Sequence, residues 1–318
     1  MKPFTGIKIK NDMEEKRNNP LVCDPVLGVC GLPEEPLQSS QTNRLAGKKP
    51  VKIICFSDPI CSFCWGIEPQ LRKLMLEYGD EVELEYRMGG LLPDWNYNRG
   101  GISKPSDVAH HWDELSSYFD MPIDGDIWLE DPLHSSFPPS VAFKAAQLQD
   151  ETRALQFLRR LREMVFVQKK NIARWETMAV AAQQSGLDVD QLQADVDGQG
   201  EKLFARDREL ARELGVKGFP TLLISGEGKE QHVIIGFKPY EMFEKAVVDS
   251  HPEAVKKDYD QSWNALFDQF PTLTTREFTE LSGQSREASE ALLQQLADQQ
   301  ELEKTAIKSG VLWTRKQA

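Results

Sequence analysis

The most informative stretch of the chain reads FSDPICSFCWG and occupies residues 56–66. Directly before it, residues 51–56 are β-branched or apolar, which predicts a buried strand. Directly after it, four apolar residues recur at the spacing of a helix: Ile67, Leu71, Leu74 and Met75. The two cysteines of the stretch, Cys61 and Cys64, are therefore expected at a corner where a strand ends and a helix begins.

Two thiols at this spacing, on such a corner, are typical of thiol–disulfide exchange. Cys61 would lie at the helix N-terminus, where unpaired N–H groups and the helix dipole favour a negative charge. This position predicts a lowered thiol pKa and makes Cys61 the expected nucleophilic thiolate. Cys64 lies one turn later and would attack the mixed disulfide formed at Cys61.

The same spacing also occurs in half of a zinc site, which would need two more ligands. The remaining candidates are Cys23, Cys30, Cys55 and five scattered histidines, and none of them forms a second tight pair. The strand–helix corner favours the redox interpretation, so we predict neither a metal site nor a cofactor.

Composition excludes several classes of protein. The formal charge of −12 over 318 residues argues against a general nucleic-acid or anionic-membrane surface. The sequence contains no stretch of ~18 apolar residues, so no transmembrane helix is predicted. Residues 1–20 lack the apolar centre of a secretory signal. Five cysteines are too few for a disulfide scaffold in a chain of this length. We therefore expect a cytoplasmic protein.

The first 49 residues are polar and rich in Pro, Asn and Gln, which predicts a flexible N-terminal arm. Cys23 and Cys30 lie within it, on either side of an Asp-Pro pair and a glycine that favour a turn. The turn could join the two thiols as a second redox pair, or leave them as unpaired thiols. Both interpretations remain open.

A strand–helix–strand unit and a helical block follow the arm. Residues 81–88 alternate between apolar and polar, which predicts a second strand parallel to the first. Between about residues 103 and 200 the strand pattern disappears and helical periodicity predicts an insertion. A helix, a strand, a turn, a strand and a helix are then expected at residues 201–215, 221–224, 226–229, 232–236 and 240–248.

Residues 251–318 are additional to this pattern. They predict a long helix at residues 252–270, followed by two helices and a hairpin, an order that resembles a winged helix. DNA binding would need basic side chains on the second of these two helices. On that helix the basic residue Arg286 is outnumbered by the acidic residues Glu287, Glu290 and Asp298. A protein-interaction or dimerisation module is therefore favoured over DNA binding.

Over residues 50–250 these features resemble a thioredoxin-like protein of the DsbA family. The resemblance rests on the Cys-x-x-Cys corner, on PSVAFKAA at residues 139–146 within the insertion, and on GFPT at residues 218–221. The residues around the two cysteines are most similar to the cytoplasmic branch, which includes FrnE-like proteins and predicted disulfide isomerases. They are also similar to the SpxH (YjbH) adaptor family, whose members present the transcription regulator Spx to the ClpXP protease.

The resemblance implies an α/β, thioredoxin-like fold with an α-helical insertion, followed by the small winged-helix-like module. It implies that Cys61 attacks a substrate disulfide and that Cys64 resolves the mixed disulfide. Pro220 would be the cis-proline beside the thiols, Phe219 would pair with the substrate chain through its backbone, and Trp65 would border the site. The Ser-Phe dipeptide between the cysteines lacks the His of strongly oxidising members, which leaves the reduction potential open.

Two functions are therefore predicted. The first is a thiol–disulfide oxidoreductase or isomerase that acts on protein disulfides through Cys61 and Cys64. The alternative is a non-enzymatic adaptor that delivers a regulator to the ClpXP protease. A glutathione-dependent isomerase of the kappa branch is disfavoured, because that branch normally carries Ser at the position of Cys61.

Overall fold

The structure is a computed structural model that describes residues 23–24, 29–30, 48–97 and 104–316. Its centre is a four-stranded sheet in the order β4-β3-β5-β6. Strands β3 (Val51–Ser57) and β4 (Val82–Met88) are parallel, as predicted for the strand–helix–strand unit. Strands β5 (Thr221–Gly226) and β6 (His232–Ile235) extend the sheet in antiparallel fashion on the other side of β3. All of β3 is buried, which explains its continuous apolar sequence.

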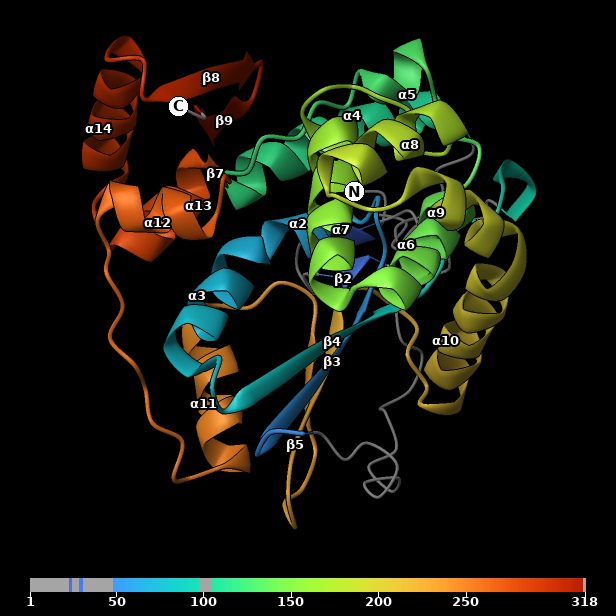
Figure 1. Cartoon of the computed structure of the whole chain (residues 1–318), viewed down its shortest axis with the longest axis horizontal. Coiled ribbons are helices and arrows are strands. Elements are labelled where there is room, and N and C mark those ends of the chain that lie inside the picture. The colour runs from blue at the N-terminus through green and yellow to red at the C-terminus, as the bar shows by residue number, and fades with distance from the viewer. Residues whose placement is uncertain (1–22, 25–28, 31–47, 98–103, 317–318) are drawn as a thin grey trace, which may run out of the picture.

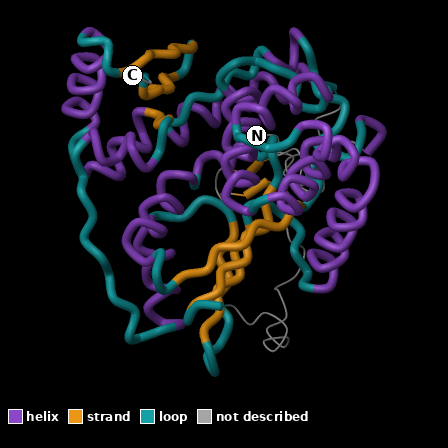
Figure 2. The backbone as a smooth tube through the Cα atoms, viewed as in Figure 1, coloured by secondary structure: helices purple, strands orange, loops and turns teal. Residues whose placement is uncertain are grey.

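Helices cover both sides of this sheet (Figures 1 and 2). Helices α3 (Glu68–Tyr78) and α11 (Tyr240–Ser250) pack together on one side. On the other side, α10 (Glu201–Glu213) packs against β4 and α6 (Phe137–Gln149) packs against α10. This is the thioredoxin-like arrangement that the sequence predicted.

The predicted helical insertion lies between β4 and β5. Its helices are α4 (Pro105–Phe119), α5 (Ile127–Glu130), α6, α7 (Glu151–Phe166), α8 (Trp175–Gln184) and α9 (Val189–Asp195), and a π-helical turn (Val196–Gly200) leads into α10. A short 3₁₀ turn (Trp95–Tyr97) precedes them. Helix ends follow local sequence rules: the Asp150 side chain accepts a hydrogen bond from the Arg153 N–H at 2.8 Å and begins α7.

One predicted helix is wrong in part. Residues 252–262 are not helical, and α12 (Trp263–Gln269) begins only after Ser262. The Ser262 hydroxyl accepts a hydrogen bond from the Ala265 N–H at 3.4 Å, which places the N-cap at this position. Upstream, the Lys257 N–H donates to the Glu77 carbonyl at 2.8 Å, so this linker uses its backbone to bind α3 instead of forming a helix.

The chain ends in a small α/β unit, residues 263–315, which we call the C-terminal segment. It contains α12, β7 (Thr272–Thr274), α13 (Thr275–Ser282), α14 (Arg286–Asp298), β8 (Leu302–Ile307) and β9 (Gly310–Arg315), with its three strands in the order β7-β9-β8. The two helices and the hairpin follow in the predicted order, and Ser285 caps α14 as expected. The segment has its own apolar core, which includes Phe267, Phe278 and Trp313.

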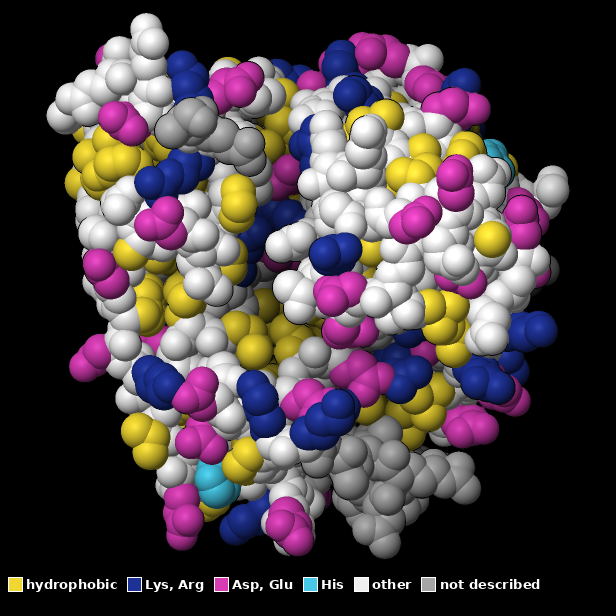
Figure 3. Space-filling view, viewed as in Figure 1, with side chains coloured by type: hydrophobic (Ala, Val, Ile, Leu, Met, Phe, Trp, Pro, Cys, Tyr) yellow, Lys and Arg dark blue, Asp and Glu magenta, His cyan; other side chains and the backbone are white. Residues whose placement is uncertain are grey.

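The C-terminal segment packs through α13 against α3 (Figure 1). The space-filling view shows a hollow between this segment and the helical insertion, and Lys or Arg side chains gather in it (Figure 3). Within the part of the chain that the structure describes, no helix is long and apolar enough to cross a membrane.

Two short strands belong to the predicted N-terminal arm. β1 (Cys23–Asp24) and β2 (Val29–Cys30) pair in antiparallel fashion, and β2 lies against α2 (Ser62–Gly66), the helix that follows Cys61. Apart from residues 48–49, the rest of the arm lies outside the described residues.

Candidate functional site

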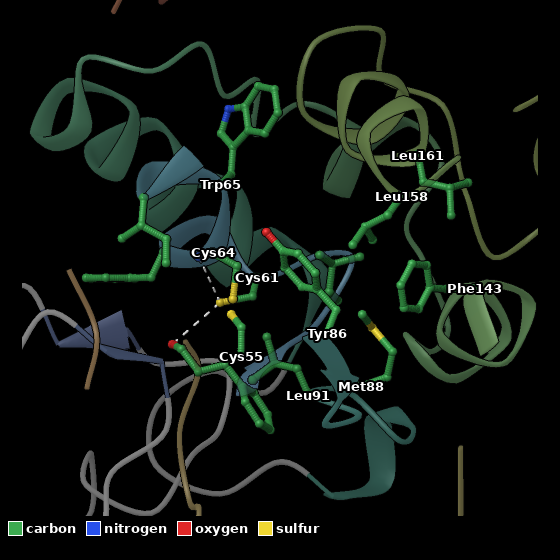
Figure 4. Packing of buried hydrophobic residues seen from close by; sticks show 14 of the residues in the cluster. Cys55, Cys61, Cys64, Trp65, Tyr86, Met88, Leu91, Phe143, Leu158 and Leu161 are labelled. Carbon is green, nitrogen blue, oxygen red and sulfur yellow. Dashed lines mark hydrogen bonds between the residues drawn. The ribbon is translucent and has the colours of Figure 1, made fainter. Parts of the chain in front are cut away.

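The two predicted thiols lie together at the C-terminal end of β3. Cys61 is the N-cap of α2, and its Sγ accepts a hydrogen bond from the Cys64 N–H at 3.3 Å. The Cys61 Sγ also lies 3.6 Å from the Phe219 carbonyl oxygen, to which the thiol donates (Figure 4). Cys61 is 0% exposed and Cys64 is 2% exposed. The structure therefore brings the two predicted thiols together, beneath the surface.

The loop that contacts Cys61 comes from the start of β5. The peptide bond between Phe219 and Pro220 is cis, as the resemblance implied. The Phe219 ring lies on the backbone of Gly89, where a Cβ atom would come within 1.8 Å of the ring. Only glycine permits this close approach at residue 89. The end of β4 therefore helps to position the loop that covers Cys61.

A buried arginine, Arg162, is connected to the thiols through Ser57. Arg162, on α7, forms an ion pair with Glu68 of α3 and donates from Nη2 to the Ser57 Oγ at 2.7 Å. Its side chain is 1% exposed. The Ser57 hydroxyl in turn donates to the sulfur of Cys64. Arg162 and Ser57 therefore supply both positive charge and a hydrogen-bond donor to Cys64.

The pKa values of the two thiols are shifted in opposite directions, which the sequence did not predict. Burial, together with hydrogen bonding and charge repulsion from Cys64, raises the pKa of Cys61 well above its usual value. Burial also opposes ionisation of Cys64, but a hydrogen bond from Cys61, the charge of Arg162 and the bond from Ser57 outweigh it and lower the pKa of Cys64. The expected lowering at Cys61 is absent because α2 is only five residues long and the sulfur is desolvated.

A third thiol points toward this pair. Cys55 lies on β3, is buried, and its side chain is directed at Cys61 and Cys64 in Figure 4. Burial and the neighbouring charge of Cys64 raise its pKa, so Cys55 stays protonated. Among the described residues, no group of three or more His, Cys, Asp or Glu side chains is arranged to hold a metal ion.

Asp58 anchors the turn before Cys61. Its carboxylate accepts hydrogen bonds from the Leu91 N–H at 2.7 Å, the Ile60 N–H at 2.9 Å and the Ser136 hydroxyl at 2.8 Å. Burial raises the pKa of Asp58 to about 6, even though these three bonds act in the opposite direction. Its negative charge also contributes to the raised pKa of Cys61.

This carboxyl predicts a pH dependence of stability. Its pKa is higher in the folded chain, at about 6, than the ordinary value of 3.8, so its contribution is largest below pH 3.8 and is lost as the pH rises through 6. The difference corresponds to about 3 kcal/mol. We expect the unfolding free energy in urea, relative to that of Asp58→Asn, to fall by about 2–2.5 kcal/mol between pH 4 and pH 7, because part of the contribution is already lost at pH 4. A difference that is constant over this range would contradict the assignment.

Trp65 requires a correction. It was expected to border the site, but it is 0% exposed. Its Nε1–H donates to the Pro122 carbonyl at 3.1 Å, and its ring stacks on Phe166 and lies 4.4 Å from the Arg159 guanidinium. Because α2 is covered by the insertion, the residue after Cys64 faces the core, and Trp65 has a packing role.

The backbone brings Cys23 and Cys30 opposite each other. They are register partners across β1 and β2, as the predicted turn suggested. Nothing is described of their side chains, so a second redox pair remains a prediction. The contact of β2 with α2 places this hairpin beside the helix that carries Cys64.

The sequence did not identify Arg162, Glu68 or Ser57 as site residues. The sequence nevertheless contained a signal for a buried ion pair, because Arg162 follows Leu158 by four residues on the apolar face of α7. An arginine on such a face needs a buried anion as a partner. The identity of that partner could not be inferred, since Glu68 precedes it by 94 residues.

Comparison with known proteins gives the family. The sequence pattern of the family described as Thioredoxin matches residues 54–245. The ClpXP adapter protein SpxH of Halalkalibacterium halodurans is 32% identical over 297 residues, which cover 92% of this chain and 96% of the relative. The chain belongs to the SpxH family of thioredoxin-fold proteins. The SpxH of Bacillus subtilis is 29% identical over 271 residues, covering 84% of this chain and 89% of that protein.

The similarity to SpxH proteins extends beyond the thioredoxin-like part. A match that covers 92% of the chain must include much of the C-terminal segment, whereas the Thioredoxin pattern stops at residue 245. Among solved structures, a putative protein disulfide isomerase from Nitrosomonas europaea is similar, with a TM-score of 0.54 and 17% identity. It covers 63% of this chain and 96% of its own, and it supports the fold alone.

Proposed function

We propose that the chain is an adaptor of the SpxH type, which binds a transcription regulator in the cytoplasm and presents it to the ClpXP protease. The observation that carries this proposal is the similarity to proteins named ClpXP adapters over 92% of the chain. That similarity includes the C-terminal segment, which a thiol–disulfide exchange reaction would not require.

Burial of the thiols supports the same proposal. A protein disulfide can be attacked only if the nucleophilic sulfur is accessible to it. Cys61 is fully buried, in contact with the Phe219 carbonyl. An adaptor does not need an accessible sulfur, so burial of Cys61 fits a binding function better than an exchange reaction.

Thiol–disulfide exchange is the second candidate, and the geometry of the pair favours it. Once exposed, Cys61 would pass its proton to the Cys64 thiolate and attack a substrate disulfide, releasing one substrate thiolate. Cys64 would then give up that proton to the released substrate thiolate and attack the Cys61 sulfur, releasing the second substrate thiolate and leaving a Cys61–Cys64 disulfide. Phe219 and Pro220, next to the Cys61 sulfur, would hold the substrate chain in register.

Cysteine variants separate the two functions. In a reconstituted ClpXP assay with Spx as the regulator, we expect the intact chain to accelerate Spx degradation, and the Cys61→Ser/Cys64→Ser variant to do so within about twofold. No acceleration by the intact chain would overturn the adaptor proposal. In an insulin-reduction assay, Cys61→Ser should abolish any turnover and Cys64→Ser should accumulate mixed disulfides. Turnover that survives Cys61→Ser would overturn exchange at this pair.

A further inference from the structure

We propose that the redox state of the thiol pair controls how firmly the C-terminal segment is held, through a chain of buried charged side chains. The chain runs from Cys64 through Ser57, Arg162, Glu68 and Arg72 to Glu277. This inference rests on the proposed thiol chemistry of Cys61 and Cys64, and it adds a regulatory consequence for the segment that the SpxH similarity includes.

The first half of the chain connects the thiols to α3. Ser57 bridges Cys64 and Arg162, whose Nη2 lies 2.7 Å from the Ser57 Oγ. Arg162 pairs with Glu68, the first residue of α3. Glu68 in turn lies 3.8 Å from the Nε of Arg72, one turn along the same helix. The charged side chains of Arg162, Glu68 and Arg72 are between 1% and 11% exposed, so solvent screens them only weakly.

The second half connects α3 to the C-terminal segment. The Arg72 Nε lies 3.3 Å from Glu277, and its Nη1 donates to the Thr272 carbonyl at 3.0 Å. Arg159 of α7 binds the same carboxylate with two bonds, of 2.7 and 3.0 Å. The side chain of Glu277 is fully buried.

Glu277 also forms the start of α13. Its carboxylate accepts the Thr274 N–H at 2.7 Å, and the Thr274 hydroxyl accepts the Glu277 N–H at 3.1 Å. This reciprocal pair is a capping box. One carboxylate therefore serves both as the counter-ion of two arginines and as the cap of the helix that packs on α3.

The charges in this cluster balance only when the thiol pair is ionised. It contains four guanidinium groups, from Arg72, Arg159, Arg160 and Arg162, against three carboxylates, from Glu68, Glu163 and Glu277. Four positive and three negative charges leave one positive charge, which a single thiolate on Cys64 neutralises.

Oxidation removes that thiolate. When glutathione disulfide oxidises the pair, two glutathione thiols are released and the Cys61 and Cys64 sulfurs become bonded and uncharged. Arg162 then keeps Glu68 as its only anionic neighbour among the contacts described above. A stronger hold of Arg162 on Glu68 weakens the bond of Glu68 to Arg72. Arg72 then turns to its other carboxylate, Glu277, because a buried charge without a partner is costly, so oxidation tightens the hold on the C-terminal segment.

Hydrogen exchange of the full-length chain tests this proposal. Cys23→Ser/Cys30→Ser is used as the background, so that oxidation by glutathione disulfide can be assigned to the central thiols. Chymotrypsin cleaves after Phe56 and Phe63 and places Cys55, Cys61 and Cys64 on separate peptides, which identifies the bond formed. We expect amides of residues 272–282 to exchange at least about 5-fold slower in the oxidised chain than in the reduced chain.

Two variants sharpen the test. Glu68→Gln interrupts the chain and should abolish the difference between oxidised and reduced protein, although the disulfide still forms. Lys73→Gln removes a second link between α3 and α13, the 3.2 Å pair with Glu280, which lies outside the chain of charges. It should leave the ratio of the two exchange rates unchanged.

Two results would overturn the proposal, and they are distinguishable. Equal exchange rates with a verified Cys61–Cys64 disulfide would exclude the coupling but leave the thiol chemistry intact. Failure of the pair to oxidise at all would overturn both the coupling and the proposed exchange reaction.

Discussion

Replacing Arg162 by methionine is expected to reduce the unfolding free energy by about 3–5 kcal/mol, because one partner of a buried ion pair is removed. Methionine approximates the length of the arginine stem but removes the nearer of the two cations of Glu68, leaving only Arg72 at 3.8 Å, and leaves the Ser57 hydroxyl without a donor. The same change removes the positive charge that lowers the pKa of Cys64. The variant should therefore be less stable and should hold less thiolate at neutral pH.

Two measurements separate these effects. Equilibrium unfolding in urea gives the stability, and thiolate absorbance at 240 nm as a function of pH gives the titration of the pair. Arg162→Lys keeps the charge but not the planar fork, so it should retain most of the thiolate while losing stability. Arg162→Met/Glu68→Gln should recover part of the stability without recovering the thiolate. An unchanged thiolate titration in Arg162→Met would refute the electrostatic role of Arg162.

Much of this fold could be predicted from the sequence, because many of its elements are specified by signals that lie within a few residues of one another. The apolar run before Cys61, the cysteine spacing and the capping serine at residue 285 each specify a local structure, and each is found where expected. The long helix predicted from residue 252 failed, because contacts with α3 hold the linker in an extended form that helical periodicity cannot reveal.

The environment of the site could not be predicted in the same way. Whether Cys61 is exposed depends on a loop that begins 158 residues later, at Phe219. The direction of the thiol pKa shifts depends on Arg162, which reaches the site from the insertion. The helix-terminus argument for Cys61 considered only neighbours in sequence, and desolvation by distant segments outweighed it.

Replacing Asp207 by leucine is expected to cost about 3–5 kcal/mol and also to loosen the cover over Cys61, because several buried donors lose one acceptor. Asp207 is on α10 and is fully buried. Its carboxylate accepts the Arg87 Nη1–H at 2.7 Å and the Met88 N–H at 3.0 Å, and it pairs with Lys144 of α6 at 3.0 Å. It therefore fixes α6 and α10 to the end of β4.

Loosening the end of β4 should affect the thiols through Gly89, the residue that follows Met88. Gly89 is the backbone on which the Phe219 ring rests, and the Phe219 carbonyl contacts the Cys61 sulfur. We therefore expect iodoacetamide to alkylate Cys61 faster in Asp207→Leu under conditions where the variant remains folded.

Asp207→Asn keeps an acceptor for the Met88 N–H and should lose less stability. Glu209→Gln, at an exposed position on the same helix, should stay within about 0.5 kcal/mol of the original chain. If Asp207→Leu lowered stability but left the alkylation rate unchanged, α10 would stabilise the sheet without controlling access to Cys61.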